Sequence, residues 1–500
     1  MADTRDLNLL LKNKNALTVV ETYDEARAVD LLKKVFKTMR LPVFVWTCTS
    51  GAEYQGLAIE QSSSERERYK DPEAMLRHMR YHRPPSAWVL CDFHHFLDEP
   101  VNVRYLKEIA LGAESLGHRV VLLSHQLELP KELTRHANKT SLRLPDDDEI
   151  MALVREEARE WAEKNRGKRI KTDMDVLQSL VQNLKGLTHQ DVRKLAYGAI
   201  NDDGAIAAAD ITSVARAKFA LMNMDSVLHY EYDTAKMAEV AGLTNLREWL
   251  EARRAMMGRE SGGDNDAPYQ LDNPKGVLLF GVQGGGKSLA AKAIAGAFSL
   301  PLLRLDMAAL YNKYIGESER NLREALALAD LMHPCVLWID EIEKGLAEDS
   351  ESGVSKRILG TLLTWMAERK TRVFVVATSN DISILPPELM RKGRFDEIFF
   401  VDLPGKAVRV EIFRIHMEKR GIDPTDFDLA ELADASEGFT GAEIEQAIVS
   451  AVFAAVSAGT SVDEEELVRA ISSTRPLSVT MAEKIRDLQL WAKGRAVNAG

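Results

Sequence analysis

The sequence contains little cysteine and no long apolar run. Its three cysteines, Cys48, Cys91 and Cys335, lie in or beside apolar stretches without the spacing of a metal site, which predicts core thiols in a reducing compartment. No window approaches the roughly 18 uninterrupted apolar residues that a membrane span needs. Residues 1–14 are charged and lack an apolar core segment, so we expect no signal peptide. These absences predict a cytoplasmic protein without an integral membrane segment.

An excess of positive charge is also missing. The formal net charge is −11 and the isoelectric point is about 5.6, which argues against a protein held to nucleic acid by bulk electrostatics. Neither the His-Glu-x-x-His motif of metalloproteases nor a serine nucleophile elbow occurs. With 500 residues, of which 45% are hydrophobic, the chain is long enough for about three domains.

In the first part of the chain, apolar runs alternate with helical patterns. The predicted strands are 16–20, 42–47, 87–91 and 119–124, with helices at 24–39 and 102–116. This alternation predicts a parallel, doubly wound sheet, which binds ligands at the carboxyl ends of its strands. The turn after the first strand, residues 21–25, has carboxylates and no glycine. We therefore expect no nucleotide there.

Histidines and arginines in this part allow two interpretations. His78 and His82 lie one helical turn apart, and Asp92, His94 and His95 follow, so a metal site is conceivable. A basic helix face and separate loop histidines are the interpretation that the spacing favours. The basic segment 77–83 is also the only support at the level of motifs for a role in handling nucleic acid.

The chain is organised around residues 281–288, Gly-Val-Gln-Gly-Gly-Gly-Lys-Ser, between an apolar strand and a helical pattern. This is the spacing and context of a P-loop, whose backbone N–H groups surround phosphate oxygens. Lys287 is expected to reach the β- and γ-phosphates, and Ser288 to ligate Mg²⁺.

Two acidic residues follow the predicted strand 336–339. Asp340 can hold Mg²⁺ opposite Ser288, and Glu341 is placed to orient and deprotonate the water that attacks the γ-phosphate. Asn380, at the end of strand 373–378, is positioned to hold the same water. Arg391 and Arg394 are predicted to lie at the outer edge of the domain, where an arginine could complete the site of a neighbouring subunit in a ring.

Four pairs of segments recur in the same order along the chain. They are 88–92 with 336–340, 124–133 with 379–389, 144–145 with 403–404, and 186–188 with 438–440. The first pair matches Asp92 with Asp340. Self-similarity over this length predicts a duplicated domain. The amino-terminal copy would be a nucleotide-binding fold without its phosphate loop.

Segments 281–288, 313–319, 336–341, 377–380, 393–396 and 438–443 together resemble the AAA+ superfamily, and within it the AAA branch. The P-loop, the strand at 300–306 and segment 334–344 are most similar to an AAA family encoded in algal plastid genomes, cyanobacteria and other bacteria. The resemblance implies an α/β fold: a three-layer α/β/α large subdomain with a helical lid, preceded by a degenerate AAA-like domain that lacks the P-loop. It also implies the cofactors ATP and Mg²⁺ and a homo-oligomeric ring, with six subunits the expected number.

The family pattern assigns roles to individual residues. Walker A comprises Gly281, Gly284, Gly285, Gly286, Lys287, Ser288 and the adjoining Leu289; Walker B is Asp340 and Glu341; sensor 1 is Asn380; the arginine finger is Arg394. Pore loop 1 is Lys313, Tyr314 and Ile315, while His416, Gly441 and Ala442 match residues beside the nucleotide. Two positions depart from the pattern, because Glu397 replaces a second finger arginine and Ala367 stands in the segment that signals between subunits.

These features predict the domain organisation and the function. The expected domains are 1–222, with an α/β core at about 16–145 and a lid at 147–222; a helical linker at 223–270; the large subdomain at 271–404; its lid at 405–475; and a terminal helix at 476–500. The expected function is a Mg²⁺-dependent ATPase ring that remodels or threads a protein substrate through a Tyr314 pore loop. A slow nucleotide-gated scaffold and a nucleic-acid-handling ATPase are the alternatives.

Overall fold

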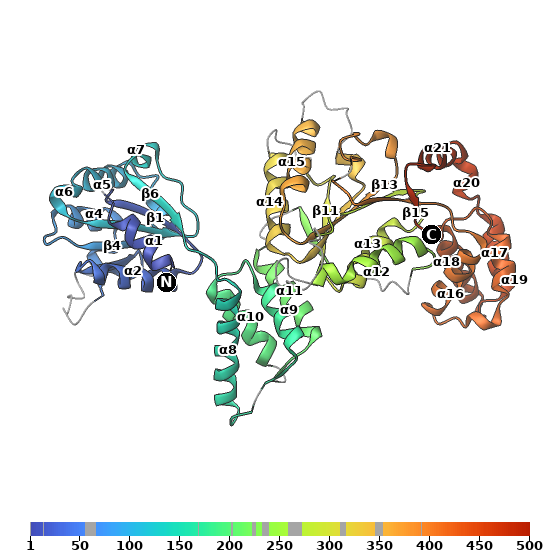
Figure 1. The fold of residues 1–500 in the computed structure, drawn as a ribbon, viewed down its shortest axis with the longest axis horizontal. Helices are drawn as coiled ribbons and strands as arrows, with labels where there is room; N and C mark the ends of the chain where they lie inside the picture. Colours follow the sequence, from blue (N-terminus) through green and yellow to red (C-terminus); the bar gives the residue numbers. More distant parts are fainter. Residues whose placement is uncertain are drawn as a thin grey trace, which may run out of the picture. The chain divides into compact units, whose positions relative to one another are not determined.

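The computed structural model describes residues 2–13, 15–55, 67–168, 170–201, 204–222, 227–232, 240–258, 273–310, 317–345, 354–391 and 393–500. The chain divides into two compact units (Figure 1). Unit 1 is Met1–Glu160 with Gly186–Tyr197, and unit 2 is Trp161–Lys185 with Gly198–Gly500.

Unit 1 is built on a sheet of six strands within its described residues. They are β1 (Leu17–Glu21), β2 (Val43–Thr47), β3 (Gly51–Tyr54), β4 (Ala87–Cys91), β5 (Arg119–Ser124) and β6 (Ala137–Ser141), in the order β3-β2-β4-β5-β1-β6. The strands are parallel except β3, which pairs antiparallel with β2 at the edge. Strand β4 is buried throughout, as a central parallel strand covered on both faces should be. The predicted parallel sheet is confirmed.

Helices cover both faces of this sheet. They are α1 (Ala2–Leu11), α2 (Glu25–Thr38), α4 (Pro72–Tyr81), α5 (Pro100–Leu111), α6 (Ala113–Leu116) and α7 (Lys131–Thr134), and α8 (Asp147–Lys164) follows them in the chain. Helices α1 and α2 pack on one face, and α4 and α5 on the other. Helix α2 begins after Asp24, whose buried carboxylate accepts a hydrogen bond from the backbone N–H of Arg27. Its own side chain therefore occupies the amino end of this helix, where a phosphate would otherwise bind.

Unit 2 contains a larger sheet, with seven strands in the part of the chain that the structure describes. They are β9 (Leu228–Glu231), β10 (Gly276–Gly281), β11 (Leu302–Asp306), β12 (Cys335–Asp340), β13 (Val373–Ser379), β14 (Glu397–Val401) and β15 (Val497–Asn498). Their order is β15-β14-β10-β13-β12-β11-β9, and only β9 is antiparallel to its neighbour among the pairings observed.

Strand β9 corrects our expectation of a wholly helical linker at 223–270. Leu228 and Tyr230 are buried, whereas His229 and Glu231 are not. This alternation has the period of a strand, and β9 pairs with β11 at the edge of the sheet. The described helix of this linker is α12 (Thr244–Gly258).

Unit 2 has three layers (Figure 1). Helices α12 and α13 (Lys287–Phe298) pack on one face of the sheet, and α14 (Glu317–Leu331) and α15 (Val354–Glu368) on the other. The lid has a core of its own. It comprises α16 (Lys406–Glu418), α17 (Leu429–Ala435), α18 (Gly441–Ala458) and α19 (Glu464–Ser473), followed by α20 (Leu477–Thr480) and α21 (Ala482–Ala492). The predicted α/β/α fold with a helical lid is confirmed.

A buried lysine links α11 (Ala208–Met222) to the end of α9 (Met174–Leu184) and to α14. Helix α10 (His189–Asn201) lies between α9 and α11 in the chain. Lys218 of α11 donates hydrogen bonds to the carbonyl oxygens of Lys185 and Leu331. Leu331 ends α14, so this ammonium joins α11 to the layer that covers the sheet. Burial lowers the pKa of Lys218 to about 8.

The parallel strands of the two sheets share one topology. The order β6-β1-β5-β4-β2 of the parallel strands corresponds to β14-β10-β13-β12-β11. Each set is extended by an antiparallel edge strand, but β3 follows β2 in the chain whereas β9 precedes β10. Both β5 and β13 end in serine, Ser124 and Ser379. The structure therefore supports the duplication that the sequence predicts.

The register corrects one predicted pair. Counting from the two serines, Cys91 and not Asp92 occupies the place of Asp340, and Asp92 occupies that of Glu341. Asp92 and Glu341 share a left-handed backbone, with φ of 51° and 47°, and each precedes a 3₁₀ turn. The sequence match of aspartate with aspartate was therefore wrong by one residue.

Gly276 begins β10 in a conformation that only glycine adopts easily, with φ of +147°. A Cβ atom there would lie 2.0 Å from the carbonyl oxygen of Val375. We expect Gly276→Ala to destabilise unit 2 by about 3 kcal/mol or more. Gly360→Ala is the control, because Gly360 is exposed on α15 with open space around its Cα. That change should be neutral or stabilising by up to about 1 kcal/mol. Denaturation followed by circular dichroism measures both, and equal effects would contradict the prediction.

Candidate functional site

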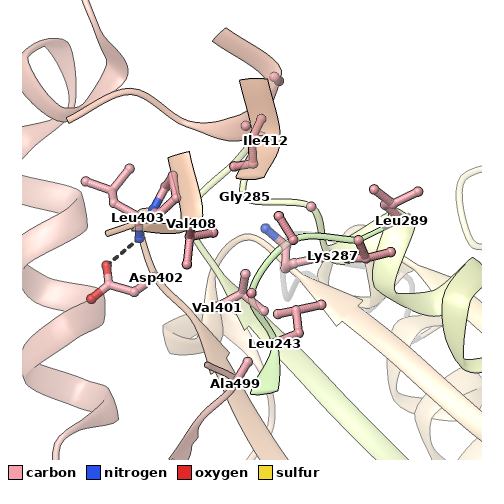
Figure 2. Close-up of a pocket in the computed structure, with 18 of the residues that line it drawn as sticks. Leu243, Gly285, Lys287, Leu289, Val401, Asp402, Leu403, Val408, Ile412 and Ala499 are labelled. Carbon is pink, nitrogen blue, oxygen red and sulfur yellow. Dashed lines mark hydrogen bonds between the residues drawn. The ribbon is translucent and has the colours of Figure 1, made fainter. Parts of the chain in front are cut away.

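A cavity of about 500 Å³ lies in unit 2, where the ends of β10, β12 and β13 meet the lid. Its described lining residues are 240–243, 283–289, 340–341, 378, 380, 401–405, 408, 412, 415–416, 441–442, 445 and 498–500. Figure 2 shows Lys287 and Leu289 on one side of the cavity and Val408 and Ile412 on the other. The cavity therefore brings together segments from the whole length of unit 2.

The loop between β10 and α13 forms the first wall. Gly284 and Gly286 have φ of +76° and +94°, so the turn needs glycine at both positions. Lys287 begins α13, and its ammonium donates to the carbonyl oxygens of Gly281 and Val282 at 3.0 and 2.9 Å. Burial lowers the pKa of Lys287 to about 8, although nearby carboxylates oppose the shift. The loop and the helix start thus present N–H groups and one ammonium to an anion.

The second wall is acidic. Asp340 ends β12, and its Oδ1 accepts a hydrogen bond from the Thr378 hydroxyl at 2.8 Å. The same hydroxyl accepts from the backbone N–H of Glu341 at 3.1 Å. Asn380 Nδ2 donates to Glu341 Oε1 at 2.8 Å, and Lys344 pairs with the other carboxylate oxygen. The two acids are therefore held at fixed places by the ends of neighbouring strands.

Sequence reasoning assigned no role to Thr378. It is a buried polar residue that follows the apolar run 373–377 of β13, two residues before Asn380. A polar side chain in a buried strand requires a partner, and this signal could have found it. Its partners are the backbone and the side chain of the acidic pair.

The lid closes the cavity from a third side. The backbone N–H of Ala442 donates to the carbonyl oxygen of Gly284 at 3.3 Å, which ties the start of α18 to the P-loop. Thr440 and Glu443 form a capping box at the same helix end. His416 of α16 lines the cavity, and burial lowers its pKa, although Glu445 opposes the shift.

The structure brings most of the predicted site residues to this cavity. Those that line it are Gly284, Gly285, Gly286, Lys287, Ser288, Leu289, Asp340, Glu341, Asn380, His416, Gly441 and Ala442. Gly281 does not line it: a Cβ there would lie 2.0 Å from the carbonyl oxygen of Val401, so this glycine permits the close approach of two strands. Arg394 also lies outside the lining and is half-buried.

The predicted pore loop of Lys313, Tyr314 and Ile315 lies outside the described residues. In unit 1, His78 Nδ1 and the Tyr69 hydroxyl share a hydrogen bond of 3.0 Å, and the His78 ring packs against that of His82. Within the described ranges, no group of three or more histidine, cysteine or acidic residues could hold a metal ion. The interpretation of these residues as a basic helix face and separate loop histidines stays a prediction.

The donor set of the cavity fits a divalent cation that prefers oxygen. Ser288 offers a hydroxyl, and Asp340 and Glu341 offer carboxylates, all of which line the same cavity. Mg²⁺ prefers such hard oxygen ligands and combines one or two carboxylates with phosphate.

Family comparisons cover most of the chain. The model of the ATPase family associated with various cellular activities (AAA) matches residues 277–403, and that of the AAA+ lid domain matches 426–469. The SpoVK-like AAA ATPase N-terminal domain matches 3–141, and the second domain of that family 148–225. The AAA domain-containing protein ycf46 of Pyropia yezoensis is 34% identical over 504 residues, which span 99% of each chain. The chain belongs to this family of AAA ATPases.

Other AAA proteins show the same relationship. The ycf46 protein of Guillardia theta is 32% identical over 502 residues, 98% of this chain and 95% of that protein. The proteasome-activating nucleotidase of Aeropyrum pernix is 36% identical over 213 residues, 41% of this chain and 52% of its own. The predicted resemblance and the predicted ATPase activity are confirmed.

One helix in the described part of this AAA ATPase, α18, is long and apolar enough to cross a membrane by composition alone. It begins with the capping box beside the cavity and buries Ile444, Ala447 and Ile448 in the lid core. A core helix of a lid passes the same test, so α18 is weak evidence for a membrane segment.

The lowered pKa of Lys287 predicts a pH dependence of nucleotide binding. The charged ammonium attracts phosphate, and in the free protein it loses its proton as the pH rises through about 8. We expect the affinity for ATP to fall between pH 7 and 9.5, by up to about tenfold per pH unit above the pKa. Lys287→Arg, which stays charged in this range, should remove the dependence. Equilibrium binding of a fluorescent ATP analogue measures it, and a flat profile for the unsubstituted protein would contradict the prediction.

Proposed function

We propose that the protein is a Mg²⁺-dependent ATPase that assembles into a ring, with six subunits, and remodels or threads a protein substrate. The observation that carries the proposal is a shortage of positively charged side chains in the cavity. Among its described lining residues, Lys287 is the only lysine or arginine. Phosphoryl transfer needs cationic groups around the oxygens of the transferred phosphate, and a trans arginine is a common source. Arg394, outside this cavity, is the residue that would supply that charge to a neighbouring subunit.

The described residues divide the chemistry among them. The P-loop and Lys287 would bind and orient the phosphates, with Ser288 and Asp340 holding the metal. Bound Mg²⁺ would neutralise part of the phosphate charge. Glu341 would take a proton from the attacking water, and Asn380, hydrogen-bonded to it, would fix the orientation of its carboxylate. Thr378 would hold both acids in place.

Two further observations support assembly and a protein substrate. Helix α18 exposes Phe453 and Val456, whose accessible fractions are 71% and 72%, and apolar side chains on a surface favour burial against another subunit. The proteasome-activating nucleotidase, by its name, acts on the proteasome, which supports a polypeptide as substrate. A cytoplasmic location remains part of the proposal.

A nucleotide-gated scaffold with slow turnover is the second candidate. Glu397 stands at the place of a second finger arginine and accepts a hydrogen bond from the backbone N–H of Ile398. A carboxylate here would weaken charge stabilisation between subunits. The nucleic-acid alternative gains no support, because Arg77 and Arg80 form ion pairs with Glu73 and Glu108.

Mixing two inactive variants tests the ring. Glu341→Gln should bind ATP without turnover, and Arg394→Ala should lose at least about tenfold in turnover. A mixed ring would place an intact Arg394 beside an intact Glu341 at about a quarter of its interfaces, so mixing should restore activity. Arg469→Ala, at an exposed arginine of α19 that does not line the cavity, is the control and should retain turnover. Light scattering with and without ATP follows assembly. A monomer whose turnover is insensitive to Arg394→Ala would exclude the ring.

Replacing Tyr314 tests threading separately from hydrolysis. An aromatic side chain in a pore grips a polypeptide by nonspecific contact, so Tyr314→Ala should stop ATP-driven unfolding of a fluorescent protein with an unstructured tail. Basal turnover should persist, and Tyr314→Phe should retain unfolding. If Tyr314→Ala unfolds the substrate as well as the unsubstituted protein does, threading through this residue is wrong and the scaffold gains support.

A further inference from the structure

The last residues of the sequence return to the cavity. After α21, β15 pairs in parallel with β14, through Val497 with Phe399 and Asn498 with Phe400. The backbone N–H of Ala499 then donates to the carbonyl oxygen of Phe400 at 2.9 Å. Residues 497–499 therefore extend the sheet beside β14.

The same segment is bonded on its other side to the start of α12. Ala499 O accepts from the backbone N–H of Leu246 at 3.1 Å, and Asn498 O accepts from Asn245 Nδ2 at 3.0 Å. A strand held from both sides has a defined position. The segment is thus a fixed part of the structure where it lines the cavity.

The cavity has two chemically different ends. Lys287, Ser288, Asp340 and Asn380 lie at the polar end, which suits the phosphates and the metal. The remaining walls are mostly apolar and come from residues 240–243, from the lid residues 408, 412 and 415, and from residues 498–500. The flat faces of a nucleotide base are apolar, and they suit this second end.

Packing at the second end is tight. Ala499 is 1% exposed and belongs to one core cluster with Val240, Leu243 and Val401, and Figure 2 shows it beside Leu243 and Val401. A Cβ atom on Gly500 would lie 2.3 Å from the backbone nitrogen of Leu243. Small residues at 499 and 500 therefore allow the segment to lie directly against the 240–243 wall.

We infer that Asn498, Ala499 and Gly500 form a wall of the base-binding part of the nucleotide site and contribute to its affinity for the adenine ring. The inference rests on the proposed placement of ATP, with its phosphates at Lys287. Without these residues, the backbone groups of β14 at Phe400 and the side chain of Leu243 would face solvent, and the base would lose one of its apolar contacts. The phosphate end, which these residues do not line, would keep its geometry.

Comparing two ligands distinguishes the contribution of the base to binding from that of the phosphates. The dissociation constants of ATP and inorganic triphosphate are measured, both with Mg²⁺, for the full chain and for a variant lacking residues 498–500. We expect the deletion to weaken ATP binding by roughly tenfold or more and to leave triphosphate binding unchanged. Ala499→Trp, which places a large ring at the same wall, should have the same selective effect. Val497→Ala is the matched control, because Val497 does not line the cavity, and should change neither constant.

Each other outcome is informative. Equal ATP affinity in the deletion variant and the full chain would overturn the inference and leave the proposed ATPase function intact. If the deletion and Ala499→Trp each weakened the binding of ATP and of triphosphate equally, the inference would also be overturned. The segment would then support the whole site and not only the part that binds the base. If the full chain bound neither ligand, the proposed placement of ATP would itself be wrong.

Discussion

The site depends on three parallel strands that end at the same edge of the sheet. β10, β12 and β13 are adjacent in register, so the P-loop, the acidic pair and Asn380 emerge at one edge of the sheet. The Thr378 hydroxyl then joins the ends of β12 and β13 through Asp340 and Glu341. A shift of one residue in any of these strands would exchange a side chain of the site for one of the core. The lid adds its contacts to a site whose polar end the sheet has already placed.

The polar end of the site could be predicted from sequence because each part is local. A glycine pattern before a helix and an acid after an apolar strand carry their chemistry in a few neighbouring residues. The apolar end could not, since its walls come from segments such as 240–243 and 498–500, about 250 residues apart, and no local pattern links them. The strand β9 was missed for a related reason: four residues with alternating burial are too short to outweigh the helical pattern that follows. Arg394 was predicted by its place in a family pattern, and the structure shows only that its own cavity does not use it.

Unit 1 lacks the residues with which unit 2 would bind a nucleotide. The order of its parallel strands repeats that of unit 2, yet Cys91 stands at the place of Asp340 and the turn after β1 lacks glycine. The buried carboxylate of Asp24 caps α2. A backbone N–H group at the helix end that would attract a phosphate is therefore already hydrogen-bonded to a carboxylate of the same chain. Burial raises the pKa of the Cys91 thiol to about 12, so the place of the Asp340 carboxylate is taken here by a group that is neutral at ordinary pH. The order of the parallel strands and the backbone turn at Asp92 are nevertheless the same as in unit 2.

The ammonium of Lys218 has a mechanical consequence. It is held by two peptide carbonyl groups from different elements, and an unpaired charge buried at that depth would be costly. Sliding α11 along α14 would break these bonds before any other contact could replace them. We therefore expect α9 and α11 to move together with α14, since any displacement of α14 would be passed to both helices through this one ammonium.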